Sequence, residues 1–245
     1  INAMNGRRTG NSSTILVANN KRLVSDKAKA QAFVEYYASV SALAGKHPQP
    51  PIRRDAANGA PPVSAAEVLT ALGGISDGKA AGGDEVYAEM LHHLGQKAMD
   101  VLTELVDESV RKGVVPSAWR TAIIVPLPKP GKDSSTLAGF RPVALTSTIC
   151  KVVERVICNR IVATLDKRLS DKQCGFRQGR STMDQMASLL ERAKLAIDGK
   201  KKAAALLIDF SQAFDRVRHG KLIEKMYLMG IDPYIYLVLP RVLGA

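Results

Sequence analysis

The chain has 245 residues, of which 46% are hydrophobic and 24% are charged, so it is long enough to bury a sizeable core and is not compositionally disordered. Its net charge of +12 points to a polyanionic partner, although a merely soluble basic surface is the alternative on charge alone. No apolar stretch reaches the 18 residues that a membrane-spanning helix needs, so no segment of this chain is expected to span a membrane.

The charge is distributed unevenly along the chain. Residues 1–60 carry +6 and residues 61–119 carry −5. Residues 120–202 hold seventeen basic against seven acidic side chains, for +10, and the remainder is nearly balanced. A middle block this basic predicts an electrostatic track for nucleic acid.

The N-terminal part is expected to form a loose arm over residues 1–20 and a helix over 26–44, followed by a Pro- and Arg-rich linker from His47 to Pro62. Ser64 with Glu67 forms a capping box that opens a short helix. Further helices are expected at about 84–93 and 97–112.

A strand is expected over Ala122–Leu127, with Pro126 favouring an edge position. The spacing then predicts a long amphipathic helix over residues 147–169, with Val152, Val153 and Val156 on its inner stripe and Arg160 outside. A helix capped by Ser181 is expected to run to about Asp198. Helices complete the chain.

The apolar run Ala203–Ile208 has the length of a buried strand and ends at Asp209. A carboxylate that finishes such a strand needs a partner, either a cation or a capping interaction with the next helix. Cys150, Cys158 and Cys174 lack metal-ligand spacing and are expected to be buried, reduced side chains.

Six segments, taken in order, resemble the reverse transcriptase domain of non-LTR (LINE-type) retrotransposons. Each pattern is weak alone, and the resemblance, over roughly residues 64–245, rests on their shared order and spacing. The segments are Lys79–Asp84, similar to the family's KAxGPDG; Ile124–Lys132; Phe140–Thr146; Lys151–Arg155; Gln173–Gln185, close to QxGFRxGRSTxDQ; and Asp209–Asp215, the first palm motif.

The resemblance implies an α/β fold that is mostly helical, comprising the fingers and the beginning of the palm of a right-hand polymerase. The expected division is an N-terminal arm, helix and linker over residues 1–62, a fingers-like region over 63–202, and the start of the palm over 203–245. The Ile1 start and the end at Ala245 favour a truncated fragment of a longer reading frame.

The resemblance also implies site residues. Asp209 and the Phe210 carbonyl would be metal ligands. The complete enzyme would hold two Mg²⁺ ions. Phe214 would pack under the nucleotide sugar, and Arg141 would bind the triphosphate, with Lys129 and Lys132 nearby. Arg177, Gly179 and Arg180 would contact the template backbone. For the two lysines, a solvated turn is nearly as good an interpretation.

The implied activity is RNA-directed DNA polymerisation, with an RNA template, a DNA primer and dNTPs as partners and the nucleus as location. The second palm motif, aromatic-x-Asp-Asp, does not occur in this sequence, and only Asp215 and Asp232 follow Asp209 among aspartates. This chain by itself is therefore expected to be inactive. The alternative is a degenerate, non-catalytic relic of the domain that binds RNA.

Overall fold

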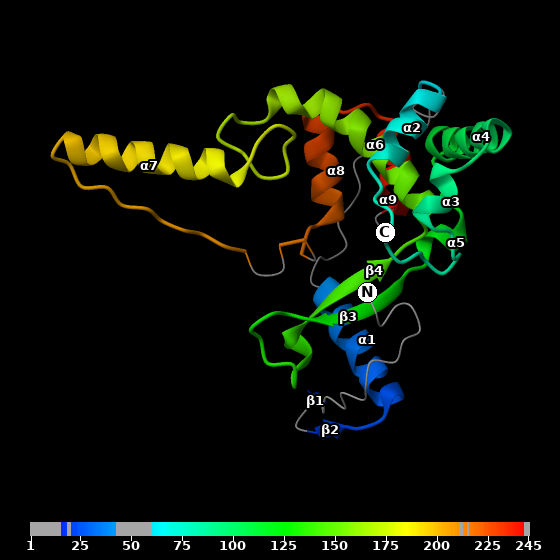
Figure 1. Ribbon diagram of the computed structural model, residues 1–245, viewed down its shortest axis with the longest axis horizontal. Helices are drawn as coiled ribbons and strands as arrows, with labels where there is room; N and C mark the ends of the chain where they lie inside the picture. The colour runs from blue at the N-terminus through cyan, green and yellow to red at the C-terminus, as the bar shows by residue number, and fades with distance from the viewer. Residues whose placement is uncertain (1–15, 19–20, 43–59, 211–212, 215, 243–245) are drawn as a thin grey trace.

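The computed structural model describes residues 16–18, 21–42, 60–210, 213–214 and 216–242. They form nine helices longer than three residues and two separate two-stranded antiparallel sheets. Figure 1 shows a helical body with two projections, one made by α7 and the segment that follows it, the other by a β-hairpin with α1. The expectation of a mostly helical fold with few strands is confirmed.

The N-terminal unit is a small hairpin followed by a helix. Strands β1 (Leu16–Ala18) and β2 (Lys21–Leu23) pair, and α1 spans Asp26–Ala42, close to the helix expected over 26–44. The prediction of a loose arm is thus wrong for residues 16–18, which pair with residues three to seven positions further along the chain. Residues 1–15 and 43–59, which hold most of the expected arm and linker, lie outside the described residues.

Helices α2 (Ala65–Gly73), α3 (Ala88–His92), α4 (Gln96–Lys112) and α5 (Ser117–Arg120) follow. The Ser64–Glu67 capping box that opens α2 is confirmed. The helix predicted over 84–93 begins only at Ala88, because Glu85 adopts a φ of 56°, which interrupts right-handed helix.

The second sheet is a hairpin of β3 (Ile123–Pro128) and β4 (Phe140–Leu145), joined by a loop that includes the 3₁₀ turn Leu137–Gly139. Pro126 lies opposite Pro142 in this ladder. Both strands are edges, which is why two prolines without N–H donors are tolerated. The edge position of Pro126 is confirmed.

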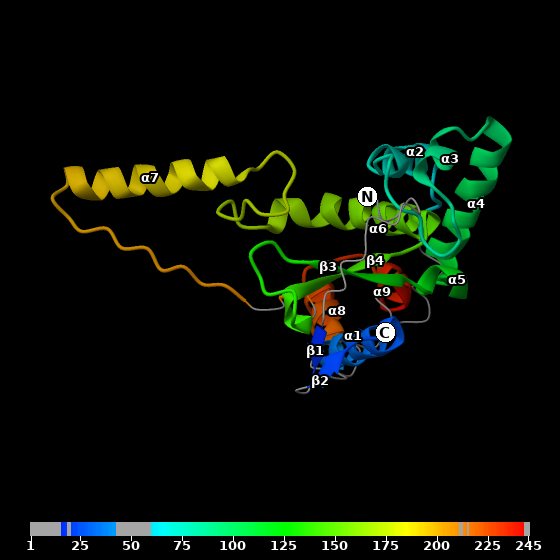
Figure 2. The same cartoon turned by 60° about the horizontal axis from the view of Figure 1, so that its bottom comes forward.

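The helical body is built around α6 (Thr148–Leu165), which ends in the 3₁₀ turn Asp166–Arg168. Val152, Val153 and Val156 on its expected inner stripe are almost fully buried. They pack in one cluster with α2, α4 and the C-terminal helices α8 (His219–Leu228) and α9 (Ile235–Val242). Figure 2 shows α6 on one side of the β3–β4 hairpin and α1 on the other.

Helix α7 (Thr182–Asp198) stands away from this body, and no residue of it is buried. The expected cap is confirmed, since Ser181 and Asp184 form a capping box. Among the described residues, the chain has no helix long and apolar enough to cross a lipid bilayer. Of the three cysteines that were expected to be buried, only Cys150 is buried. Cys174 is half-buried, and Cys158 is exposed on the solvent side of α6.

Candidate nucleotide and nucleic-acid site

The segment that delivers Asp209 is extended but is not part of a sheet. Residues 201–210 have no regular secondary structure, and Leu206 and Leu207 are 86% and 90% exposed. The predicted buried strand is therefore wrong for this structure. A strand exists only beside another strand that takes up its N–H and C=O groups, and the ladders of the described residues join only β1 to β2 and β3 to β4.

Asp209 itself is exposed and lines a hollow of about 540 Å³. The same hollow is lined by Phe210 and by the cation Arg216. Within the described part of the chain, no three His, Cys, Asp or Glu side chains lie close enough to hold a metal ion together. One carboxylate and one carbonyl supply part of one coordination shell, so the described residues do not fit a site for two ions.

Phe214 brings two distant motifs together. Its ring meets the Phe176 ring edge to face, with centroids 5.9 Å apart. Both side chains are largely solvent-exposed, and Phe176 has a φ of 58°, which is uncommon for a non-glycine residue. The Gly-rich basic loop around residues 175–180 therefore lies against the segment that begins at Asp209.

The two arginines of this loop differ in availability. Arg177 is held internally: its guanidinium binds Asp166 Oδ1 at 3.0 Å, the Asp166 carbonyl at 3.1 Å and the Ser170 carbonyl at 2.9 Å. Its side chain is only 7% exposed. Arg180 makes one ion pair, to Asp171 at 3.1 Å, and remains accessible beside Gly179, whose φ is 72°.

A groove of about 670 Å³ connects Arg180 with the extended segment. One wall is α7, and the opposite wall is Ala205, Leu206 and Leu207. Figure 1 shows this segment running back alongside α7 toward α8. Three cations, Lys172, Arg180 and Arg192, line the groove together with two carboxylates, Asp171 and Asp184.

The β3–β4 hairpin carries the predicted triphosphate ligands. Arg141 is exposed and lies opposite Leu127 in the ladder, which places both on the same face of the hairpin. That face is opposite to the one bearing Phe140, which contacts Phe33 of α1. Lys132 is exposed, whereas the Lys129 ammonium donates to the Ala138 carbonyl at 2.9 Å and supports the loop.

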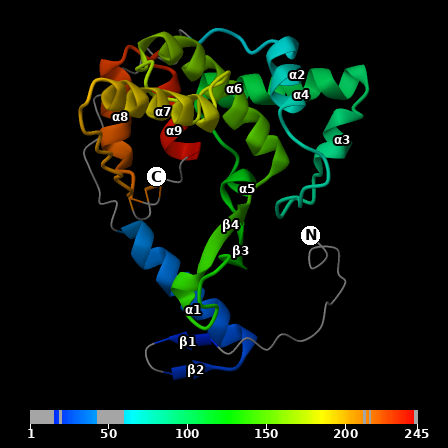
Figure 3. The same ribbon diagram turned by 60° about the vertical axis from the view of Figure 1, so that its left-hand side comes forward.

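The structure does not join all the predicted site residues. Among the described residues, no hydrogen bond or ion pair connects Arg141 with Asp209 or Arg180. Figure 3 shows the hairpin and α1 reaching away from the helical body that carries α6 and α7. The predicted residues thus fall into two groups: Arg141 and Lys132 belong to the hairpin, and Arg180, Phe214 and Asp209 belong to the Gly-rich loop and the extended segment.

Close packing explains why the segment Lys79–Asp84 has a glycine at position 82. A Cβ atom on Gly82 would lie 2.6 Å from Ser147 N and Thr146 C, both backbone atoms. Nearby, the Thr148 hydroxyl donates to the Val86 carbonyl at 2.6 Å. This segment is therefore packed directly onto the junction between β4, which carries Arg141, and α6.

Sequence reasoning missed a partly buried ion pair that joins α2 to α6. Arg160, expected outside, donates to Glu67 through Nε at 2.7 Å and Nη2 at 3.1 Å, and also reaches the Pro61 and Pro62 carbonyls. The prediction for Arg160 is wrong because α6 is covered on that side as well. The hydrogen bonds from Arg160 hold the pKa of Glu67 at about 2. No signal in the sequence pairs residues 93 positions apart.

Comparison with known proteins finds similarity to one family over part of the chain. The family described as reverse transcriptase (RNA-dependent DNA polymerase) matches residues 127–243. Three similar proteins of Drosophila melanogaster are the probable RNA-directed DNA polymerases from transposon BS and from transposon X-element and the RNA-directed DNA polymerase from mobile element jockey. They are 35%, 34% and 30% identical to this chain.

The aligned parts differ greatly in their share of each protein. They cover 71%, 72% and 72% of this chain but 19%, 20% and 19% of the three relatives, respectively. The chain therefore spans about a fifth of the length of these relatives. The matched residues include the hairpin strand β4, the Gly-rich loop and the segment of Asp209.

Proposed function

We propose that this chain, of which residues 127–243 match the reverse transcriptase family, forms the fingers and the start of the palm of an RNA-directed DNA polymerase from a non-LTR retrotransposon. The observation that carries the proposal is the meeting of Phe214 with Phe176, because it places the Asp209 segment against the basic Gly-rich loop. The substrates would be an RNA template, a DNA primer and dNTPs. Because such elements integrate into chromosomes, the place of action would be the nucleus.

The fingers would comprise residues 63–202 and the palm would begin at residue 203. The exposed apolar side chains of residues 206–208 and 210 support this division. A run with this composition is stable as the strand of a sheet covered on its faces. The neighbouring strands would come from another part of the polymerase. About four fifths of the length of the relatives lies outside the part that aligns with this chain.

The site residues would act on different parts of the substrates. Arg141 would bind the triphosphate with its planar guanidinium, supported by the exposed Lys132. Phe214 would pack against the nucleotide sugar. Arg180 and Gly179 would contact the template backbone, whereas Arg177, whose donors are used within the loop, would position that loop.

Reverse transcriptases generally use divalent metal ions, and we propose Mg²⁺ for this one. A pair of such ions would supply positive charge that stabilises the negative charge developing during nucleotidyl transfer. Asp209 and the Phe210 carbonyl would hold part of that pair. Because the described residues supply one carboxylate at this place, the remaining ligands would lie elsewhere in the polymerase, and the chain on its own would bind RNA without extending a primer.

The test is primer extension on an RNA template by the complete polymerase that contains this segment. Replacing Asp209 with Asn should lower the rate by at least about a thousand-fold, because a metal ligand provides several kcal/mol of charge stabilisation. Asp198→Asn, at the exposed end of α7, is the control and should retain the wild-type rate. Equal extension by the Asp209 variant and the wild type would remove this carboxylate from the mechanism. RNA binding by the complete protein without any extension would instead support a non-catalytic relic.

A further inference from the structure

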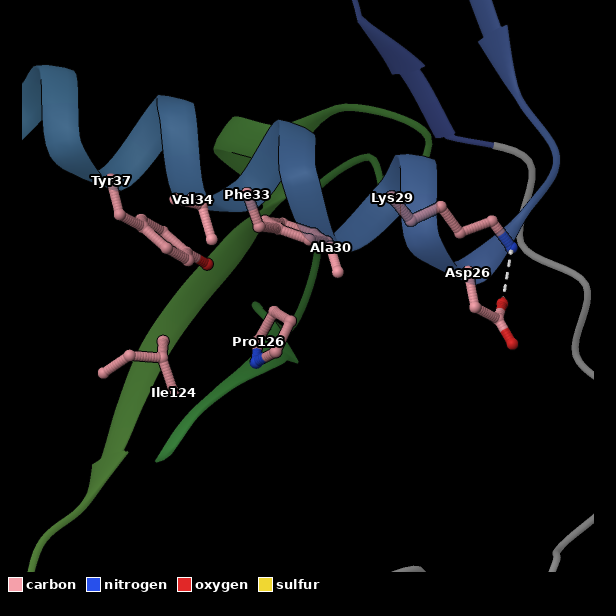
Figure 4. A pocket seen from close by; sticks show the side chains of 8 residues that line it. All are labelled: Asp26, Lys29, Ala30, Phe33, Val34, Tyr37, Ile124 and Pro126. Atoms are coloured by element: carbon pink, nitrogen blue, oxygen red, sulfur yellow. Dashed lines mark ion pairs between the residues drawn. The ribbon is translucent and has the colours of Figure 1, made fainter. Parts of the chain in front are cut away.

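An apolar groove lies between α1 and β3 and includes none of the proposed site residues. Its volume is about 470 Å³. The α1 side is formed by positions 26, 29, 30, 33, 34 and 37, which share one helical face, and Ile124 and Pro126 of β3 form the other side. Figure 4 shows the Tyr37 and Phe33 side chains of α1 directed toward these two β3 residues.

The groove is built on the hairpin face opposite to Arg141. Ile124 and Pro126 alternate with Val125 and Leu127, and Leu127 is the residue that pairs with Arg141. The α1 unit is attached firmly here: the Phe33 ring meets the Phe140 ring with centroids 5.1 Å apart, and Val17 N donates to the Ser135 carbonyl at 2.8 Å. The groove is therefore a separate site from the proposed triphosphate ligands.

One polar atom inside the groove lacks a partner. The Tyr37 hydroxyl is buried, and no hydrogen-bond partner for it exists in the part of the chain that the structure describes. Leaving a buried hydroxyl unpaired costs free energy, so a ligand that hydrogen-bonds to it is favoured. Burial also raises the pKa of Tyr37, which keeps the hydroxyl neutral and able to donate.

A cation stands at one end of the groove. Lys29 Nζ lies 3.8 Å from Asp26 Oδ1, and the Asp26 side chain is fully exposed. The Lys29 side chain is 20% exposed. Because its partner Asp26 is fully exposed and the two charges are 3.8 Å apart, the pair contributes little, and the ammonium is available to a stronger anion. The groove thus combines aromatic and proline surfaces, one hydrogen-bonding hydroxyl and one cation.

We propose that this groove binds a nucleobase of a single-stranded nucleic acid. The base would lie between the α1 aromatic face and the β3 residues Ile124 and Pro126, with one polar edge atom bonded to the Tyr37 hydroxyl. The adjoining phosphate would reach Lys29. Stacking between aromatic and apolar side chains with a nearby cation is how sequence-tolerant single-strand sites work. The inference rests on the proposed function, since a polymerase of this kind handles single strands.

An apolar peptide segment is the competing occupant. Charge favours the nucleic acid: residues 16–42 hold four basic and two acidic side chains, and the net charge of the chain is +12. A peptide would use the apolar walls but would gain nothing from Lys29. Substitutions at Lys29 and Asp26 should therefore change the affinity for a nucleic acid but not the affinity for an apolar peptide.

The test uses the full chain and fluorescent 12-nucleotide RNA and DNA strands at fixed salt. Tyr37→Ala should weaken binding by about 5- to 100-fold, the loss expected for one stacked base, and Tyr37→Phe by a smaller factor. Tyr227→Ala, an exposed tyrosine on α8, is the matched control and should bind as the wild type does. If Tyr37→Ala weakens the binding of only one of the two oligonucleotides, RNA or DNA, that oligonucleotide is the source of the base.

Two charge variants separate the occupants. Lys29→Gln should weaken binding and reduce the slope of log K against log salt by about 1. Asp26→Asn should strengthen binding, because it removes the competitor for the ammonium. The binding of an apolar fluorescent dye to the groove is measured in parallel. If the Lys29 and Asp26 variants bound nucleic acid as the wild type does, while Tyr37→Ala no longer bound the dye, the proposal would be overturned in favour of a peptide.

Localisation of the contact keeps this inference distinct from the proposed function. Strands carrying 4-thiouridine or 4-thiothymidine should crosslink on irradiation to α1 or β3 residues of the groove. Crosslinks only to residues 165–200, with wild-type affinity in Tyr37→Ala, would overturn the groove while leaving the polymerase assignment intact. No nucleic-acid binding by the wild type would overturn both. Circular dichroism melting of each variant checks that the fold is retained.

Discussion

At the scale of single residues, Arg160 shows how a basic side chain in a basic protein becomes structural. Its guanidinium is directed into the interface between α2 and α6, where it binds Glu67, two proline carbonyls and the Tyr234 hydroxyl. Arg177 is used in the same way within the Gly-rich loop. Net charge alone therefore overstates how many cations are free to bind phosphate.

The Glu67–Arg160 pair should make stability depend on pH. Because the folded pKa of Glu67 is about 2, below its ordinary value of 4.5, the contribution is complete above pH 5 and is lost as the pH falls toward 2. Glu67→Gln should lower the free energy of unfolding at pH 7 by about 1–2 kcal/mol, after allowance for solvent screening. Urea unfolding of the wild type and of Glu67→Gln at pH 7 and pH 3 measures this difference in the free energy of unfolding.

The exposed pair Lys112–Glu108 on α4 provides the control for this measurement. Glu108→Gln should change the free energy of unfolding by at most about 0.5 kcal/mol. A Glu67→Gln variant with the same stability deficit at pH 3 as at pH 7 would show that the carboxylate does not act through its charge.

At the scale of elements, the close contact between residues 79–86 and the β4–α6 junction explains why a glycine-containing segment precedes the hairpin. Gly82 lies against the backbone of Thr146 and Ser147, which cannot move without displacing the start of α6. Helix α7 illustrates the opposite case. Its capping box is sufficient to start it, yet it packs against nothing that buries any of its residues.

Substitution at Gly82 should separate packing from chain flexibility. Gly82→Ala should destabilise the protein by about 1–3 kcal/mol, because the added methyl would overlap backbone atoms. Gly83→Ala is the matched control, since the nearest atom, Ile123 Cδ1, is 4.0 Å from the added carbon. Thermal unfolding followed by circular dichroism compares the two variants, and equal losses of stability would contradict the steric explanation.

At the scale of the whole molecule, the charge asymmetry gives a prediction for RNA binding by the intact chain. The block of residues 120–202 carries +10, and counterion release from bound phosphates should make log K fall linearly with log salt. Arg180→Gln or Lys132→Gln should reduce that slope by about 1 each, because both side chains are accessible.

Lys97→Gln, in the acidic block of residues 61–119, is the control and should leave the slope unchanged. Fluorescence anisotropy at four or more salt concentrations provides the slopes. A flat salt response in the wild type would contradict phosphate contacts by the basic block.

The sequence by itself determined the local structure of this protein and its similarity to reverse transcriptases. Capping residues such as Ser64 and Ser181 and the apolar stripe of α6 act over a few residues, so helix positions follow from the chain alone. The motifs from Lys79 to Asp215 likewise depend on order and spacing. Strand β4 was missed, because its membership in a hairpin depends on a partner strand.

Only the tertiary structure decided which of these residues meet. It paired Glu67 with Arg160, placed Phe176 against Phe214, and formed the groove between α1 and β3. It also left the run before Asp209 extended and exposed, where propensity predicted a buried strand. The physical reason is that burial, pairing and ring contacts are made between segments far apart in the chain, whereas propensity and capping act only between close neighbours.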